Sequence, residues 1–181
     1  MFPLNDNFDA TSLDSLEPVF NELLSRDVKS VSDLEVFFSD ISDMAEHISE
    51  AGARLYIGMT CDTENELKQT NFLNFVENIR PRMSEVSNEL DLKILNLDFL
   101  EQLSDRYSLI LRSMRNSIEI FREENIPLSV ECTKLSTEYQ KIIGAMTVNF
   151  EGMEYTLPQI CLLYTSPSPR DVNRSRMPSS A

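Results

Sequence analysis

The sequence predicts a mainly α fold, with about five antiparallel amphipathic helices, then a short β-hairpin and a disordered C-terminal tail. Two observations predict it. Apolar residues recur at steps of three and four along most of the chain, which is the period of a helix with one buried face. Between Met146 and Leu157 apolar and polar residues alternate, which is the period of a strand.

The first two helices are predicted in the N-terminal third of the chain. Pro18 lies near the start of the first helix, where its missing N–H costs little. The second is expected to begin at the capping box Ser32-Asp-Leu-Glu35 and to end between Gly58 and Asp62. Their apolar stripes are Leu13, Leu16, Phe20, Leu23 and Leu24, then Leu34, Phe37, Ile41, Met44, Ile48, Ala51 and Leu55.

Three more helices are predicted before the hairpin. The third begins at the capping box Thr63-Glu-Asn-Glu66, and Pro81 predicts a kink or a division into two shorter helices. The fourth is expected to begin at Asp98 and to stop at Asn125-Ile-Pro127, after which the fifth follows. The three stripes are Leu67, Phe72, Phe75, Val76, Ile79, Met83, Val86 and Leu90; Leu100, Leu103, Tyr107, Ile110, Met114, Ile118 and Phe121; and Cys132, Leu135, Tyr139, Ile142 and Ile143.

The hairpin is predicted around Glu151-Gly152, with Gly152 supplying a positive φ. A two-stranded hairpin alone is marginally stable in water, so it is expected to pack on another surface. Cys161–Ala181 contains five Ser, three Pro and three Arg but no Lys, Glu, Phe or Ile, which is typical of a disordered tail. This segment also resembles translated adapter DNA from sequencing libraries. We therefore divide the chain into residues 1–159 and a non-native, adapter-derived tail, 160–181.

Composition excludes several function classes. The net charge of −14 would repel phosphate, so nucleic acid is not expected as a partner. No run of eighteen apolar residues could span a membrane. The opening MFPLNDNFDA lacks the features of a signal peptide, and the three cysteines are widely scattered. Together these features predict a cytoplasmic protein.

The sequence contains no complete catalytic or metal-binding motif, so we assign no catalytic, cofactor-binding or metal-ligating residue. His47 is the single histidine and shares a helix face with Glu50. A metal site would need at least one more ligand and an enclosing shell, so an exposed His–Glu pair is expected. Cys61 lacks a second histidine that could activate it, and a loop or half-buried thiol is expected.

Two further groups of side chains have both a structural and a functional interpretation. Glu119, Glu123 and Glu124 could do acid–base work, but on an amphipathic helix they are expected to form a solvated face. Tyrosine residues could line a peptide channel, but core packing with the hydroxyl at the edge is the default. The tyrosines in question are Tyr107, Tyr139 and Tyr155.

The body of the chain, about residues 1–159, resembles the N-terminal region of bacterial M3-family zinc oligoendopeptidases, the oligoendopeptidase F group. Four stretches carry the resemblance, and none is a catalytic motif. They are ISEAGARLYIGMTCDT (Ile48–Thr63), NSIEIFREENIPL (Asn116–Leu128), EYQKIIGAMTV (Glu138–Val148) and EGMEYTLPQ (Glu151–Gln159).

The resemblance implies that the parent enzyme hydrolyses oligopeptides in a channel between two lobes, with zinc held by an H-E-x-x-H helix and a downstream Glu. All of these residues would lie beyond this chain. The fragment is therefore expected to bind no zinc, to be inactive and to pack against the missing catalytic lobe. The alternative is a free-standing acidic helical bundle that acts as an interaction scaffold.

Overall fold

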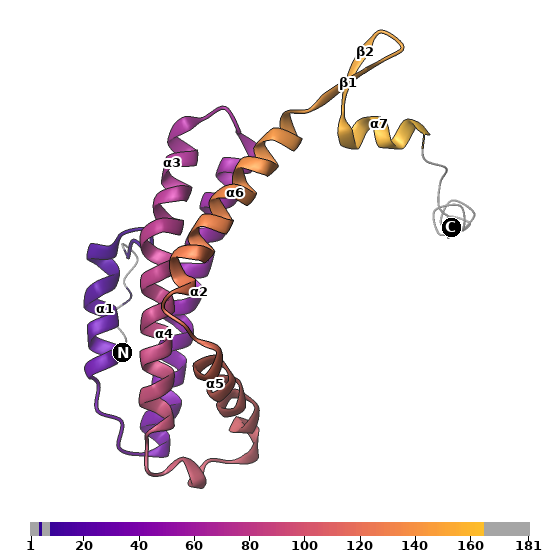
Figure 1. Ribbon diagram of the computed structural model, residues 1–181. Helices are drawn as coiled ribbons and strands as arrows, with labels where there is room; N and C mark the ends of the chain where they lie inside the picture. Colours follow the sequence, from indigo (N-terminus) through magenta and orange to yellow (C-terminus); the bar gives the residue numbers. More distant parts are fainter. Residues whose placement is uncertain (1–3, 5–7, 165–181) are drawn as a thin grey trace, which may run out of the picture. The chain divides into compact units, whose positions relative to one another are not determined.

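The structure is a computed structural model that describes residue 4 and residues 8–164, in two compact units, Met1–Leu135 and Ser136–Ala181. Figure 1 labels the elements. In order they are α1 (Leu13–Ser25), α2 (Val31–Cys61), α3 (Glu66–Asn74), the π-helical turn η1 (Phe75–Ile79), α4 (Arg80–Leu95), the 3-10 turns η2 (Leu100–Gln102) and η3 (Asp105–Tyr107), α5 (Ser108–Ile120), α6 (Asn125–Ala145), β1 (Thr147–Phe150), β2 (Met153–Thr156) and α7 (Leu157–Tyr164). The predicted mainly α fold with a hairpin is confirmed.

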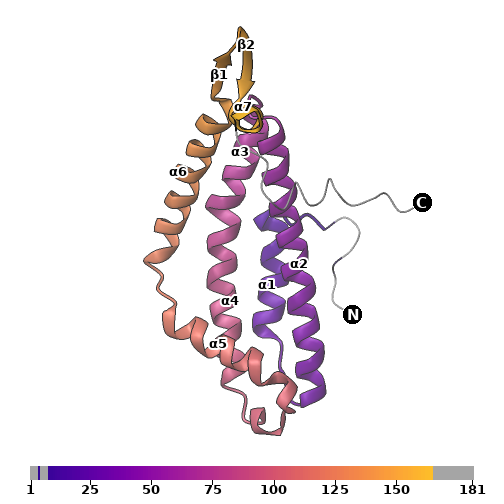
Figure 2. The same cartoon turned by 90° about the vertical axis from the view of Figure 1, so that its right-hand side faces the viewer.

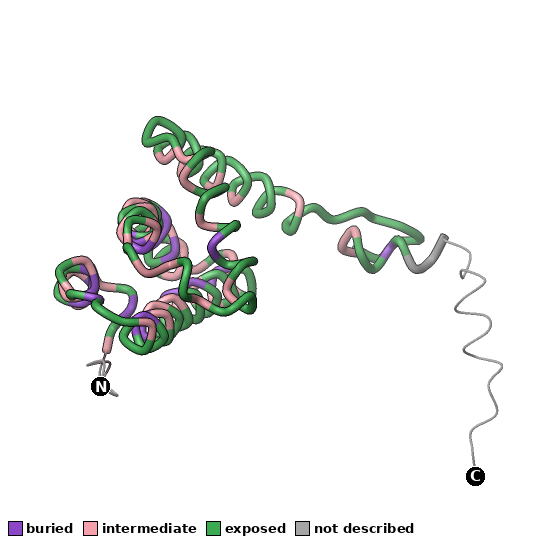
Figure 3. Tube along the Cα trace, turned by 90° about the horizontal axis from the view of Figure 1, so that it is seen from below, coloured by how far each residue is buried: buried purple, intermediate pink, exposed green. Residues whose placement is uncertain are grey.

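In the first unit, α1, α2 and the rod formed by α3, η1 and α4 run side by side, as two perpendicular views show (Figures 1 and 2). Short connections join them, so successive helices are antiparallel. Buried residues are purple in Figure 3; Met59, Phe72 and Val76 form a smaller cluster, and the facing sides of the helices form one larger hydrophobic core. Its fully buried side chains include Leu16, Phe20, Leu23, Leu34, Phe37, Met44, Val86 and Ile94. The stripes predicted for the first two helices therefore supply the core.

Polar side chains fasten the C-terminal end of α1 to its neighbours. Lys93 on α4 donates hydrogen bonds from Nζ to the backbone oxygens of Leu23 and Leu24, both at 2.9 Å, and to that of Arg26. Arg26 forms ion pairs with Glu22, at 2.7 Å, and with Asp40 on α2. Lys93 thus satisfies carbonyls that the last turn of α1 leaves without helical partners, while its cation lies near the negative end of the helix. Burial lowers the pKa of Lys93.

Both predicted capping boxes are displaced by two residues. The N-cap of α2 is Ser30, whose hydroxyl accepts from the Asp33 N–H at 3.1 Å. The N-cap of α3 is Asn65, whose side-chain oxygen accepts from the Lys68 N–H at 3.2 Å. At the start of each helix, two residues two positions apart could both serve as the N-cap. The N-cap is the one whose side chain accepts a hydrogen bond from an early backbone N–H group.

As predicted, the third helix consists of two shorter α-helices, α3 and α4, and a π-helical turn just before Pro81 joins them. In η1 the Arg80 N–H donates to the Phe75 carbonyl, five residues back. Pro81 follows directly, within the first turn of α4. Proline lacks the N–H that an α-helix needs and its ring clashes with the carbonyl four residues earlier, so local widening of the helix relieves both problems. Helical backbone therefore continues from Glu66 to Leu95.

The prediction that a helix begins at Asp98 was wrong. Two 3-10 turns, η2 and η3, occupy that segment, and α5 begins only at Ser108. The stripe residues Leu100 and Leu103 still pack against the core from these turns. The apolar spacing therefore correctly predicted that these two side chains contact the core, but it did not predict the backbone conformation of their segment. On α5 itself, Leu111 is the buried residue, whereas the predicted Ile110 is 39% exposed.

Helix α6 begins at Asn125, so the sequence Asn125-Ile-Pro127 opens a helix rather than only ending one. The face predicted to be buried there was also wrong except at Ile143, which is partly buried. Cys132 is exposed, and Leu135, Tyr139 and Ile142 are each at least 60% exposed. The opposite face, with Ile126 and Val130, is partly buried. Figure 3 shows α6 mostly in green.

In the second unit, β1 and β2 form an antiparallel hairpin in which Phe150 pairs with Met153. The two turn residues between them, Glu151 and Gly152, have φ of 50° and 80°. Positive φ at both positions is the signature of a type I′ turn. The predicted hairpin and the role of Gly152 are confirmed.

Helix α7 follows the hairpin and packs against both strands. The Thr156 N–H donates to Gln159 Oε1 at 2.9 Å, which is half of a capping box that the sequence T-L-P-Q encodes. Ile160 is buried. Residues 160–164 are helical, although disorder was predicted for them. The remainder of the predicted tail, 165–181, lies outside the described residues. No helix in the described part of the chain is long and apolar enough to cross a membrane.

Candidate functional site

The residues singled out from the sequence do not converge on one site. His47 is exposed, donates from Nδ1 to the Asp43 carbonyl at 2.7 Å and meets the Phe8 ring edge-on. Glu50 is also exposed, but it accepts from Arg54 at 2.6 Å and 3.0 Å instead of pairing with His47. Within the described residues there is no group of three or more His, Cys, Asp or Glu side chains that could hold a metal ion.

Cys61 is the last residue of α2, and its thiol is exposed rather than half-buried. The neighbouring Asp62 carboxylate accepts from Lys68 at 2.9 Å and from Asn65 at 3.2 Å, and these hydrogen bonds lower the pKa of Asp62. This arrangement ties the end of α2 to the start of α3. It is a structural junction, because the groups that surround Asp62 are already engaged with one another.

The three glutamates are exposed, as predicted, although Glu123 and Glu124 lie in the turn after α5 and not on a helix face. The tyrosines differ from one another. Tyr107 stacks on Phe38 and donates its hydroxyl to Glu35 at 2.6 Å, which fits packing at the edge of the core. Tyr139 is 64% exposed, so core packing was wrong for it, and Tyr155 is partly buried.

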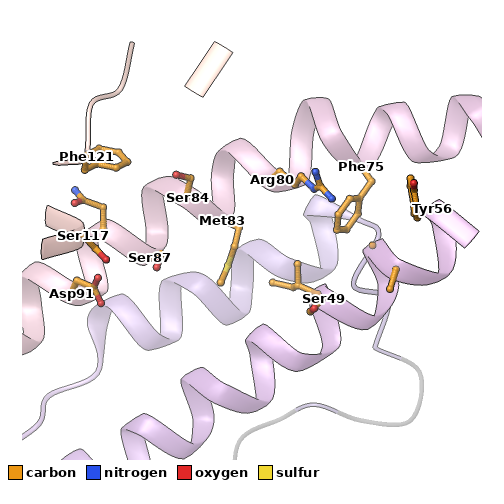
Figure 4. Close-up of a pocket in the computed structure, with 14 residues that line it drawn as sticks. Ser49, Tyr56, Phe75, Arg80, Met83, Ser84, Ser87, Asp91, Ser117 and Phe121 are labelled. Atoms are coloured by element: carbon orange, nitrogen blue, oxygen red, sulfur yellow. The ribbon is translucent and has the colours of Figure 1, made fainter. Parts of the chain in front are cut away.

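A concavity in the described part of the chain lies elsewhere, in a trough of about 700 Å³ between α2, α4 and α5. Typical small-molecule sites have volumes of roughly 300–1,000 Å³. Figure 4 shows Arg80 beside Phe75 and Tyr56 toward one end of the trough, and Asp91 with Ser117 and Phe121 toward the other. The trough lining is Ile48, Ser49, Gly52, Ala53, Tyr56, Phe75, Arg80, Met83, Ser84, Ser87, Asn88, Asp91, Ser117 and Phe121.

One polar face of α4 forms a wall of the trough. Arg80, Ser84, Ser87, Asn88 and Asp91 are spaced by four, three, one and three residues, so they lie in a row along the helix. This face was not predicted from the sequence. Its spacing was visible, but a polar face on an amphipathic helix ordinarily faces solvent, and only the crossing of α5 turns it into a wall.

Asp91 is the titratable group of this wall whose environment is most unusual. Burial raises the pKa of its carboxyl group, and its side chain has no hydrogen bond or ion pair with the described residues. Burial without a partner disfavours the charged form. The trough therefore holds one half-buried carboxylate whose charge the protein itself does not neutralise.

The substitution Asp91→Asn is expected to stabilise the fold slightly at pH 7. Because the folded pKa is raised, ionised Asp91 opposes folding above that pKa, and the penalty disappears as pH falls and both states become protonated. The side chain is still partly solvated, so the gain should be below about 0.5 kcal/mol. Urea unfolding at pH 7 and pH 3 measures it. A gain that persists at pH 3, or a loss at pH 7, would contradict the assigned penalty.

These features define a helical domain with a polar trough and, in its described residues, no assembled catalytic group. The sequence model of the Peptidase M3 N-terminal domain matches residues 6–121, well over half of the chain. The chain therefore belongs to the M3 peptidase family. The match includes α1 to α5 and the whole trough lining, and it ends before α6. No curated protein and no solved structure is significantly similar to the chain.

Proposed function

We propose that this chain is the N-terminal part of a cytoplasmic zinc metalloendopeptidase of the oligoendopeptidase F group, and that it is inactive alone. The observation that carries the proposal is the family match over residues 6–121. The order of the four resembling stretches between Ile48 and Gln159 supports the narrower group. In this proposal the chain supplies a helical wall beside the catalytic lobe, whose substrates are oligopeptides.

Zinc would be held by residues outside this chain. The described residues do not fit a zinc site, because they contain no cluster of three candidate ligands. The one histidine donates to a backbone carbonyl from Nδ1. A tetrahedral catalytic zinc site requires three protein ligands with an open fourth position. We therefore derive no catalytic step for residues of this chain.

The exposed face of α6 supports the proposal that another part of the enzyme covers it. Leu128, Leu135, Tyr139 and Ile142 are all more than half exposed and follow one another at heptad spacing along the helix. An exposed apolar row of this kind marks an interaction surface. On the hairpin, Phe150 and Met153 are opposite each other and are both exposed. We propose that the catalytic lobe packs on these surfaces.

We further propose that the segment from Cys161 onward is encoded by adapter DNA, so that the natural sequence departs from this chain after about residue 159. The start of α7 does not contradict this, because its capping residues, Thr156 and Gln159, precede the segment. The DNA read that encodes the chain tests the origin of the segment. A genomic sequence in which the same Ser/Pro/Arg codons precede a natural stop would favour the scaffold alternative.

The purified chain is expected to show no zinc-dependent hydrolysis of fluorogenic oligopeptides and no stoichiometric zinc binding. The product of the complete gene, which serves as the positive control, should cleave the same peptides and lose activity with a chelator. Peptidase assays and metal analysis of the two proteins measure this. Chelator-sensitive cleavage by the short chain would disprove its inactivity, and a complete gene product without peptidase activity would disprove the assignment.

A further inference from the structure

Helix α6 has an inner face and a row of apolar side chains on the opposite side. The inner face is partly buried, and its Val130 packs on the smaller hydrophobic cluster. The outer row, which we call the α6 seam, consists of Leu128, Cys132, Leu135, Tyr139 and Ile142. Four of its members lie two residues after the inner residues Ile126, Val130, Thr133 and Thr137, which is roughly 200° around a helix.

The α6 seam has the spacing of a coiled coil. Its steps of four, three, four and three residues put three of its side chains at d positions and two at a positions of a heptad repeat. The cysteine is exposed, and the other four residues are at least 57% exposed. Leucine at d positions, here Leu128 and Leu135, is typical of two-stranded parallel coiled coils. A helix whose inner face is already packed would ordinarily be polar outside, so this row indicates a second helix.

The charged residues beside the α6 seam favour one orientation of that helix. Glu131 and Glu138 occupy the g positions. In a parallel pair of identical helices each g residue meets an e residue, so the two glutamates would lie beside Ser136 and Ile143 of the second copy. In an antiparallel pair g meets g, which would set Glu131 opposite Glu138 twice over. Like charges across an interface oppose association, so the parallel pair is favoured.

We infer that the α6 seam of this chain binds a second copy of the same chain, as a parallel and in-register pair of α6 helices. The seam is then self-complementary, because each side chain meets its own counterpart. The seam covers only about two heptads, so the dissociation constant should lie in the micromolar range. The inference goes beyond the proposed function and does not depend on it, since it concerns the chain without a catalytic lobe, in which nothing competes for the seam.

The experiment is sedimentation velocity of the full 181-residue chain over a concentration series at pH 7, with a reductant present. We expect a reversible monomer–dimer equilibrium. Leu135→Glu should weaken the dimer by about tenfold or more, because every seam residue is buried in two copies. The matched control is Leu67→Glu, which adds the same charge at a leucine on α3 that is 69% exposed. Circular dichroism confirms that each variant is folded.

The orientation is tested through Cys132. In a parallel pair the two Cys132 residues face each other, and neighbouring helices can bring their Cα atoms within the ~4.4–6.8 Å that a disulfide requires. In an antiparallel pair Cys132 would lie opposite Tyr139. The variant with Cys61→Ser and Cys161→Ser retains only Cys132. Diamide, which takes up the two electrons and two protons that leave the thiols, should convert this variant to a disulfide-linked dimer, and Leu135→Glu should suppress the product.

A substitution that strengthens the pair provides an independent test. Ser136→Lys places an ammonium group beside Glu131 of the second copy in the parallel pair only. It should tighten the dimer about threefold at low salt and less at high salt, as expected for two exposed ion pairs. Ser113→Lys on α5 is the control, because it reduces the net negative charge equally at an exposed position outside α6.

Three results would overturn the inference. They are a chain that stays monomeric up to millimolar concentration, equal effects of Leu135→Glu and Leu67→Glu on the dimer, and a dimer in which Cys132 cannot be cross-linked. None of these results bears on the proposed peptidase function, which is tested separately on the complete gene product.

Discussion

Replacing Phe37 by alanine is expected to destabilise the first unit by roughly 3–5 kcal/mol, which is the usual cost of removing a fully buried phenylalanine ring. Phe37 is completely buried on α2, within the core that α1, α2 and α4 share. Two cations also lie over its ring, Lys93 Nζ at 5.1 Å and the Arg26 guanidinium at 5.6 Å from the centre. Each such contact adds about 0.5–1 kcal/mol or more.

This loss should be a large part of the total stability, because the free energy of unfolding of a domain is only about 5–15 kcal/mol. The chain contains no tryptophan, so urea unfolding is followed by far-ultraviolet circular dichroism. Val36→Ala is the matched control, because Val36 is the preceding residue of the same helix and is 56% exposed. It should change stability by no more than about 0.5 kcal/mol. Equal effects of the two substitutions would show that Phe37 does not anchor the core.

Phe37→Leu separates the ring from its hydrophobic volume. Leucine keeps most of the apolar contact but provides no π face for Lys93 and Arg26. We expect a loss of about 1–2 kcal/mol, smaller than for alanine, from imperfect packing and from the missing cation contacts. If leucine were as costly as alanine, the shape of the ring rather than its burial would dominate. Such a result would require a different account of this part of the core.

The sequence allowed the core of α1 and α2 to be predicted because their stripes are long and regular and both helices are covered by neighbours. The same reasoning failed for α6, where Leu135 and Tyr139 have equally regular spacing but are exposed. Periodicity shows that a helix has an apolar face, but it cannot show whether anything covers that face. The family match ends before α6, and what covers this helix is a proposal rather than something its own spacing could reveal.

Backbone irregularities were predicted less well than contacts. Leu100 and Leu103 reach the core from a segment whose spacing looked helical, although the backbone forms 3-10 turns. The trough was not predicted at all. Its wall consists of small polar residues on α4 that resemble any solvated face, and its concavity exists only because α5 crosses α4 and α2. A cavity is a property of tertiary packing, and single-helix patterns contain no information about it.

Alanine at Gly52 is expected to destabilise the fold by about 1–3 kcal/mol, whereas alanine at Gly58 in the same helix should stabilise it by about 0.4–1 kcal/mol. A Cβ atom at Gly52 would lie 2.8 Å from Cε1 of Phe75, a buried residue with an exposed fraction of 3%. At Gly58 no atom lies within 4 Å of the added Cβ. Alanine is favoured over glycine within helices by about 1 kcal/mol. At Gly52 the steric contact should outweigh this preference, whereas at Gly58 no such contact opposes it.

The contact with Phe75 can be tested by a double-mutant cycle. Phe75→Leu removes the ring edge that the new methyl group would meet, so Gly52→Ala should cost much less in that background, with a coupling of about 0.5–2 kcal/mol. Urea unfolding of the four proteins, with Gly58→Ala beside them, provides the values. If Gly52→Ala stabilised the wild-type fold as Gly58→Ala does, the Phe75 ring would be free to move into the trough. The close packing of η1 on α2, which sets the width of that trough, would then be wrong.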